Sequence, residues 1–124
     1  MKQQLLLLTL AVMCWGCGTT TENNNYSTFK VGNLEVMKED LGKMSWDDAI
    51  KTCAALGDGW RLPTIDELDI LYENRDRIGG FASANYWSST EGDSSGVWIQ
   101  SFDNGLQGSD VKNPTYYVRA VRAF

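Results

Sequence analysis

Two stretches in the middle of the chain place apolar side chains at the spacing of one helical face. The members of this pattern are Trp46, Ala49, Ile50, Cys53 and Ala54 in the first stretch, and Ile65, Leu68, Leu71 and Tyr72 in the second. Such spacing predicts two amphipathic helices, from Ser45 to Gly57 and from Thr64 to about Arg75. Asp48 and Glu67 lie three residues after the first residue of their helix, where a capping-box variant and a full capping box are expected.

Before and after these helices the apolar period changes to two, which predicts strands. The predicted strands cover Phe29–Val31, Leu34–Val36, Asn85–Thr90, Val97–Phe102 and Tyr116–Arg122. Gly32-Asn33 joins the first two as a hairpin, and Asp103-Asn104-Gly105 is a tight-turn pattern after the fourth. Lys38–Lys43 is predicted to be a charged loop. Helices and strands in this order predict one small α+β domain with no repeats.

The start of the chain has the pattern of an export signal. Lys2 precedes an apolar run, Leu5–Met13, that is too short to span a membrane. Gly16 precedes Cys17, which resembles the cleavage point of bacterial lipoproteins. We therefore interpret residues 1–16 as a lipoprotein-type signal peptide and Cys17 as the lipidated residue.

Other interpretations of this segment stay open. Cys14 is a second candidate for lipidation, and with Cys17 it has the C-x-x-C spacing of a redox pair. A plain secreted protein would need neither cysteine. The residues that follow are polar, so 17–28 are predicted to be a flexible tether and 29–124 the folded domain. The predicted location is the bacterial cell envelope, on the outer membrane or the cell surface.

Composition narrows the possible chemistry. The chain has 11 basic and 16 acidic side chains and a net charge of −5. This balance disfavours nucleic acid as a partner. The absence of histidine excludes an imidazole base and imidazole-bound metals. Cys53 lies on a predicted apolar helix face, where a buried thiol is favoured over a nucleophile. We therefore predict no catalytic residue, no metal and no cofactor.

The loops beside the predicted strands offer candidate ligand-binding groups. Glu91–Gly96 and Asp103–Gly105 are rich in oxygen ligands suited to calcium, although turn chemistry explains both without an ion. Tryptophan beside Asn or Asp can hold a sugar, while tryptophan in a small sheet commonly belongs to the core. The candidate ligand-binding set is Asn85, Trp87, Trp98, Asp103 and Asn104.

Three arginines stand inside apolar motifs, namely Arg61, Arg119 and Arg122. An arginine in such a place is expected to pair with a carboxylate as a structural ion pair. Glu67 or Asp66 is the predicted partner of Arg61 or Arg119.

Several motifs, taken in order, resemble one known family. They are Met44-Ser45-Trp46-Asp47-Asp48-Ala49 with Cys53, Gly59-Trp60-Arg61-Leu62-Pro63-Thr64 with Glu67-Leu68, Tyr86-Trp87-Ser88-Ser89-Thr90, Trp98 with Phe102, and Tyr117-Val118-Arg119-Ala120-Val121-Arg122. The chain from about Leu34 onward is similar to the DUF1566 family, also called the Lcl C-terminal domain after a collagen-like adhesin. The resemblance implies a C-type-lectin-like fold related to the formylglycine-generating sulfatase-modifying superfamily. Such a fold has two helices packed on a twisted, mostly antiparallel sheet with long loops.

The resemblance implies no common activity. Members of the family are commonly exported, and the adhesin that names it binds glycosaminoglycans. This chain differs in its acidic balance and in lacking collagen-like repeats. The formylglycine-generating relatives use cysteine chemistry or copper bound by paired cysteines, whereas the predicted domain has Cys53 alone. The predicted function is a non-enzymatic envelope module that binds a glycan or a protein through the loops around Asn85–Asp103. A structural or assembly subunit of an envelope complex is the alternative.

Overall fold

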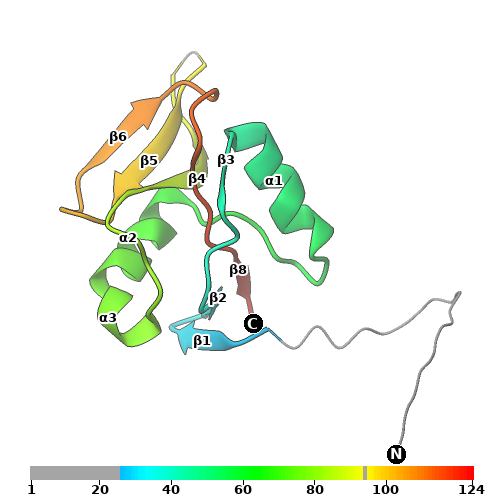
Figure 1. Cartoon of the computed structure of the whole chain (residues 1–124). Coiled ribbons are helices and arrows are strands. Elements are labelled where there is room, and N and C mark those ends of the chain that lie inside the picture. Colours follow the sequence, from blue (N-terminus) through cyan, green and yellow to red (C-terminus); the bar gives the residue numbers. More distant parts are fainter. Residues whose placement is uncertain (1–25, 94) are drawn as a thin grey trace, which may run out of the picture.

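The first strand begins at Thr28, one residue before the predicted start of the domain. The computed structural model describes residues 26–93 and 95–124 (Figure 1). The predicted export signal and its two cysteines, Cys14 and Cys17, lie outside the described residues.

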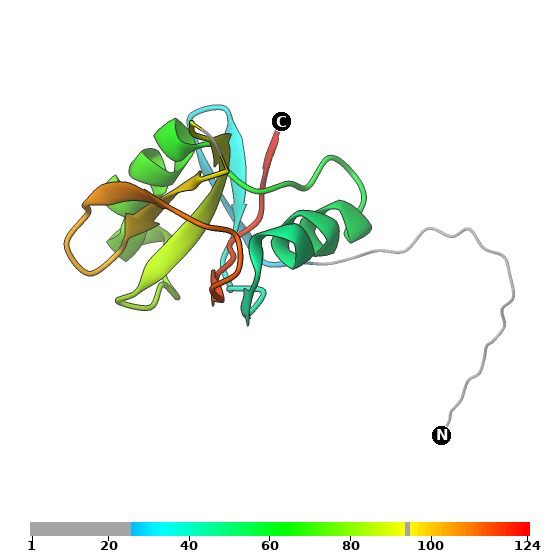
Figure 2. The ribbon, with the colours of Figure 1, turned by 90° about the horizontal axis from the view of Figure 1, so that it is seen from above.

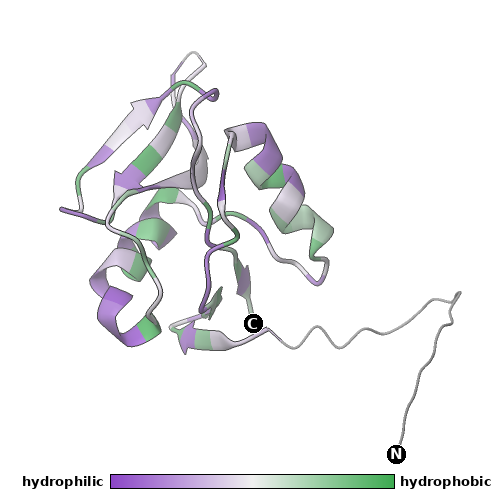
Figure 3. Ribbon diagram, viewed as in Figure 1, coloured by the Kyte–Doolittle hydropathy of each residue, from purple (hydrophilic) through white to green (hydrophobic). Residues whose placement is uncertain are grey.

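Both helices that the apolar spacing predicts are present. They are α1 (Trp46–Ala55) and α2 (Ile65–Glu73), and a short helix, α3 (Arg75–Ile78), follows α2 directly. Apolar and polar residues alternate along α1 and α2 (Figure 3), as amphipathic helices require. Gly57 has a φ of 72° just after α1, the left-handed conformation that ends many helices.

The predicted capping-box variant at Ser45 does not form. The Ser45 side chain makes no capping hydrogen bond, although its carbonyl oxygen accepts from Ala49 at 2.9 Å. The backbone N–H of Trp46 instead donates to the carbonyl oxygen of Lys112 at 3.2 Å. A distant loop therefore satisfies one of the free N–H groups at this helix start.

The strands form two sheets. Their bounds are β1 (Thr28–Val31), β2 (Leu34–Met37), β3 (Lys43–Met44), β4 (Asn85–Glu91), β5 (Val97–Ser101), β6 (Gln107–Asp110), β7 (Tyr116–Tyr117) and β8 (Val121–Ala123). One sheet has the order β1-β2-β8, and the other has the order β3-β7-β4-β5-β6. All pairs are antiparallel except β4 with β7.

The last predicted strand, Tyr116–Arg122, is divided between the two sheets. Val118, Arg119 and Ala120 separate β7 from β8, and all three are fully buried. Their backbone carbonyl oxygens accept hydrogen bonds from the end of β2 and from the loop after it. Met37 donates to Ala120 at 3.1 Å, and Leu41 donates to Val118 at 2.8 Å. The prediction of one continuous strand was wrong, since this segment crosses from one sheet to the other through the interior.

Two hydrophobic clusters lie on opposite faces of β4. Trp87 joins the cluster under α1, with Ala49 and Cys53, while its neighbour Tyr86 joins the cluster under α2, with Leu68. Successive side chains of a strand point to opposite faces, so one strand serves both clusters. Figures 1 and 2 show α1 apart from α2 and α3, with strands of the larger sheet between them.

The predicted buried position of Cys53 is confirmed. Its side chain is fully buried within the cluster under α1, and burial raises the pKa of its thiol to about 12. A thiol with so high a pKa is almost entirely protonated at neutral pH, which makes it a poor nucleophile.

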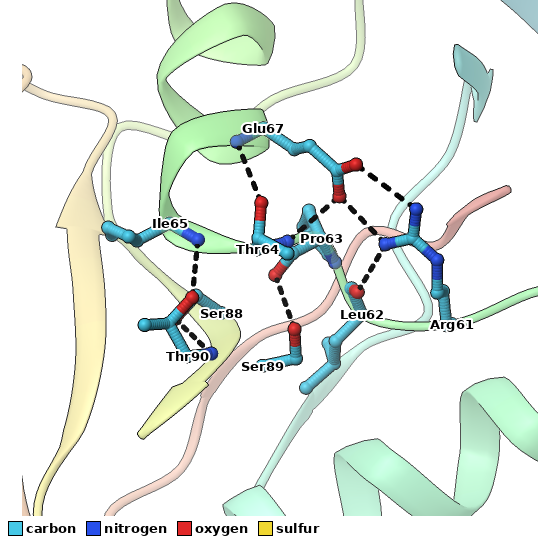
Figure 4. Close-up of polar contacts among 9 residues, drawn as sticks. All are labelled: Arg61, Leu62, Pro63, Thr64, Ile65, Glu67, Ser88, Ser89 and Thr90. Carbon is cyan, nitrogen blue, oxygen red and sulfur yellow. Dashed lines mark hydrogen bonds and ion pairs between the residues drawn. The ribbon is translucent and has the colours of Figure 1, made fainter. Parts of the chain in front are cut away.

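The predicted ion pair between Arg61 and Glu67 is confirmed and forms part of the start of α2 (Figure 4). Arg61 Nη1 and Nη2 donate to the two Glu67 carboxylate oxygens at 2.7 and 3.1 Å. Glu67 also accepts from the backbone N–H of Thr64 at 2.9 Å, and the Thr64 hydroxyl accepts from the backbone N–H of Glu67. This is the full capping box that the sequence predicts.

Strand β4 makes hydrogen bonds to the N-terminal end of α2. Its pairing with β5 is irregular between Trp87 and Glu91. Within this irregular part, the backbone N–H of Ser89 donates to the carbonyl oxygen of Pro63 at 2.8 Å. Thr90 Oγ1 accepts from the backbone N–H of Ile65 at 2.9 Å (Figure 4). The bulge thereby fixes α2 against the larger sheet. Two of the motifs that carry the family resemblance meet here in a structural contact.

We expect Glu67→Gln to lower the free energy of unfolding by about 1–2 kcal/mol at pH 7, because it weakens the capping box and the ion pair. The Arg61 hydrogen bond holds the pKa of Glu67 below its usual value of 4.5. Glu67 therefore stabilises the fold above the unfolded-state pKa, and this contribution is lost as pH falls through the folded-state pKa. Denaturant unfolding of both proteins from pH 7 to pH 3 should show their difference shrinking below about pH 4.5. A difference that stays constant would contradict this role.

The predicted carboxylate partner of Arg119 was wrong. Arg119 is fully buried and pairs with Asp40, whose Oδ1 lies 2.8 Å from both Nε and Nη2. Arg119 Nη1 donates to the carbonyl oxygens of Met37 and Gly79, at 2.9 and 3.1 Å. Its guanidinium lies 3.8 Å from the centre of the Phe81 ring. Arg122, the third such arginine, pairs with Glu35 at 2.9 Å.

Candidate functional site

Trp87 is not available to a ligand. Its side chain has 0% of its surface exposed, and its indole N–H donates to the carbonyl oxygen of Met44 at 2.8 Å. Tyr116 packs against it with a ring-centre distance of 4.9 Å. The structure therefore corrects the inclusion of Trp87 among the candidate ligand-binding residues, because the core role that tryptophan commonly takes applies here.

Trp98 is half-buried and stands apart from the other candidates. It pairs with Ser109 in β6, and it lies three residues before Ser101, which pairs with Asn85. Trp98 is therefore near the loop end of the β4–β5 hairpin, while Asn85 is at the opposite end. Residue 94 of that loop lies outside the described residues.

The remaining three candidates come together around Ser101. Asn85 is its partner across the β4–β5 pair. The Ser101 hydroxyl oxygen accepts from the backbone N–H groups of Asp103 and Asn104, at 3.1 and 3.4 Å. The Asn104 side chain accepts from the backbone of Leu106 at 3.0 Å, as expected of a tight turn. Turn chemistry thus occupies the Asn104 amide oxygen.

A cleft of about 320 Å³ opens beside Asn85. Its lining consists of Lys43, Ser83, Ala84, Asn85, Ser101, Thr115, Tyr116 and Tyr117. The cleft lies where β4 and β7 meet, and these strands pair at one position, Tyr86 opposite Tyr117. The residues just before this position on both strands line the cleft instead of continuing the ladder.

The lining combines aromatic rings with hydrogen-bonding groups and one cation. Lys43 is exposed, and its Nζ lies 5.6 Å from the centre of the Tyr117 ring. Tyr116 donates its phenol O–H to Asp110 at 2.5 Å, and this hydrogen bond raises the pKa of Tyr116 and lowers that of Asp110. The carboxylate of Asp110 thus lies next to the cleft without forming part of its lining.

Sequence reasoning missed most of this lining. The sequence predicts a charged loop at Lys43, whereas this residue belongs to the two-residue strand β3. The apolar pattern predicts Tyr116 as a strand residue and gives no signal for Ser83 and Thr115. The doublet Tyr116-Tyr117 is the feature of the sequence that could have indicated this lining. A strand places two neighbouring side chains on opposite faces, so the two tyrosines pack against different clusters and both line the cleft.

The described residues give no sign of a metal centre. Among residues 26–93 and 95–124, no group of three or more Cys, Asp or Glu side chains is placed to hold an ion. None of the helices in these ranges is long and apolar enough to cross a membrane.

Fold and sequence together identify the class of protein. Two main helices and two mostly antiparallel sheets form an α+β domain that is consistent with a C-type-lectin-like fold, as the sequence predicts. The Lcl C-terminal domain family matches residues 12–122, so the chain belongs to this family. None of the curated proteins matches the sequence significantly.

Proposed function

We propose that this protein is a non-enzymatic binding module of the cell envelope, and that its ligand is a glycan held in the cleft beside Asn85. The supporting observation is the composition of the lining, which joins two tyrosine rings to serine, threonine, asparagine and lysine side chains. A sugar presents apolar ring faces together with many hydroxyl groups, so a binding site needs both kinds of contact.

The same lining argues against glycoside hydrolysis in this cleft. That reaction uses two carboxyl groups on either side of the scissile bond. The lining residues include no Asp or Glu, and the neighbouring Asp110 is engaged by Tyr116 and by the backbone N–H of Val111. A site that offers hydrogen-bonding side chains and aromatic surface is suited to binding.

A lipid anchor at Cys17 would display this module at the membrane. Cys17→Ser is expected to move the protein from the detergent phase to the aqueous phase in a phase-partitioning assay of cell extracts. Cys14→Ser serves as the matched control and should leave the partitioning unchanged. Detergent-phase partitioning of the Cys17→Ser protein would contradict the anchor.

A second groove supports the alternative function, a subunit of an envelope complex. The lining of this groove of about 400 Å³ combines apolar side chains, among them Val31, Leu34 and Ile70, with the Arg61–Glu67 ion pair. Ile70 has 40% of its surface exposed. An exposed isoleucine beside such a groove is suited to a protein contact, because the centre of a protein interface buries apolar surface.

The two functions are separated by one paired experiment. The full chain is applied to a glycan array, with and without calcium, and is used in parallel to capture proteins from envelope extract. The glycan function predicts array binding that Ile70→Asp leaves unchanged. The subunit function predicts a silent array and a reproducible protein partner that Ile70→Asp releases.

A further inference from the structure

Strand β6 is an edge of the larger sheet and lies on the outside of the molecule (Figures 1 and 2). Edge strands expose backbone groups, and proteins commonly protect them with basic residues or proline. The other three edges of the described sheets carry a basic residue, namely Lys30 in β1, Lys43 in β3 and Arg122 in β8. β6, with the sequence Gln-Gly-Ser-Asp, has none, and its one charge, Asp110, is bound to Tyr116.

The backbone of β6 is used by β5 at every second residue. The N–H of Ser101 donates to the carbonyl oxygen of Leu106 at 2.9 Å, so Leu106 faces β5. Residues that face the neighbouring strand alternate in an antiparallel pair, so Gly108 faces β5 too. The N–H and carbonyl groups of Gln107 and Ser109 consequently point away from β5. These four groups have no backbone partner in residues 26–93 and 95–124.

Exposed apolar side chains lie at both ends of this edge. Leu106 directly precedes β6 and has 70% of its surface exposed, the largest value among the large apolar side chains of the described residues. Val111 directly follows β6 and has 52% exposed. Backbone groups give direction to a contact made by strand addition, and neighbouring side chains add to its strength. The edge therefore has the chemistry that pairs with a further strand.

The edge is complementary to a second copy of itself. An antiparallel pair with Gly108 opposite Gly108 of a second copy places Gln107 opposite Ser109 of that copy, and the reverse. All four outward-pointing groups of each copy then have a hydrogen-bond partner. We propose that two copies of the protein associate through β6 in this register, which joins their five-stranded sheets into one. The proposal does not depend on a ligand in the cleft.

The charges and side-chain volumes along the strand are compatible with this register. Leu106, Gly108 and Asp110 share one face, and Leu106 of each copy lies opposite Asp110 of the other. No two carboxylates are therefore opposed, although the chain has a net charge of −5. At the centre of the pair, no atom lies within 4 Å of the position that a Cβ of Gly108 would take, so this face is open.

The association is expected to be weak. An edge of four residues buries much less surface than the roughly 1,200–2,000 Å² of a stable interface. We therefore expect a Kd on the order of 0.1–1 mM. A lipid anchor would hold the copies in one membrane plane and so raise their effective concentration.

The first test is dilution of the isotope-labelled full chain from about 1 mM to about 0.05 mM, followed by NMR. We expect the amide signals of residues 107–110 to shift with concentration. Gly108→Lys should abolish these shifts, because it places two ammonium groups opposite each other. Ile70→Asp, which changes an exposed apolar residue of α2, is the control and should leave them unchanged. Signals of residues 107–110 that do not depend on concentration, or that still do in Gly108→Lys, would overturn the proposal.

The second test is disulfide cross-linking, which reports the register. Gly108 has no left-handed φ and open space at its Cβ position, so a cysteine fits there. Opposed residues of a pair without mutual hydrogen bonds have Cα atoms about 4.5 Å apart, within the range of a disulfide. The full chain carrying Cys14→Ser and Cys17→Ser is oxidised with oxidised glutathione, once with Gly108→Cys and once with Ser109→Cys.

We expect Gly108→Cys to form the disulfide-linked dimer roughly tenfold faster, since Ser109 lies opposite Gln107 of the second copy and not opposite itself. Ser109→Cys is the matched control, because it lies next to Gly108 on the same strand and is exposed. Equal rates, or faster cross-linking of Ser109→Cys, would overturn the pairing around Gly108.

Discussion

Arg119→Ala is expected to lower the free energy of unfolding by about 3–5 kcal/mol, the usual loss when one partner of a buried ion pair is removed. The substitution leaves Asp40 in a site where its side chain is 15% exposed, without its cation. It also deprives the carbonyl oxygens of Met37 and Gly79 of a donor. Equilibrium unfolding in urea measures the loss.

Arg122→Ala is the matched control for this prediction. Arg122 also pairs with a carboxylate, Glu35, but its side chain is 28% exposed. Ion pairs in contact with solvent contribute little, typically up to about 1 kcal/mol. Similar losses for the two variants, or an unchanged stability of Arg119→Ala, would contradict the structural role of the buried Arg119–Asp40 ion pair.

Trp87→Ala is expected to have an effect of the same size, about 3–5 kcal/mol, because a large buried ring leaves a cavity. The variant also leaves the Met44 carbonyl oxygen without its indole donor. Trp98→Ala is the control, since Trp98 is half-buried and should cost clearly less. Equal losses in thermal and urea unfolding would contradict the different positions of the two tryptophans.

The local features of the fold could be predicted from the sequence. The capping box of Thr64 and Glu67 and the nearby Arg61 ion pair involve residues within six positions of one another. Local spacing decides such contacts, so the pattern alone is sufficient. The β1–β2 hairpin was predictable for the same reason, because Gly32-Asn33 joins two alternating runs.

The contacts that join distant segments could not be predicted. Arg119 and Asp40 are 79 positions apart, and the sequence offers many carboxylates as partners. The burial of Trp87 depends on α1 packing against one face of β4 while α2 packs against the other. Alternation along a strand shows that two faces exist, but it does not show whether both are covered.

The cleft could not be predicted because short segments that are distant in the sequence meet there. Strands β4 and β7 pair at one position, Tyr86 opposite Tyr117, and β7 has only two residues. The lining residues come from four separate segments, and Lys43 lies in a strand of only two residues. In the sequence, a strand of two residues cannot be distinguished from a loop.

The motifs that identify the family mainly build the scaffold. Arg61, Thr64, Glu67 and Thr90 form the contact between α2 and β4, and Trp87 belongs to the core. Most of the cleft lining falls outside these motifs. The family resemblance therefore predicts the fold well and gives little information about the ligand.

Glycan binding by a pair of single variants tests the proposed site most directly. Asn85→Ala changes the cleft, whereas Trp98→Ala changes the other end of the same hairpin. The full chain and both variants are applied to one glycan array at equal concentration, after circular dichroism has shown that all three are folded. We predict a sugar signal that Asn85→Ala removes and Trp98→Ala retains. A silent array, or a signal that Trp98→Ala removes and Asn85→Ala retains, would contradict a glycan site in this cleft.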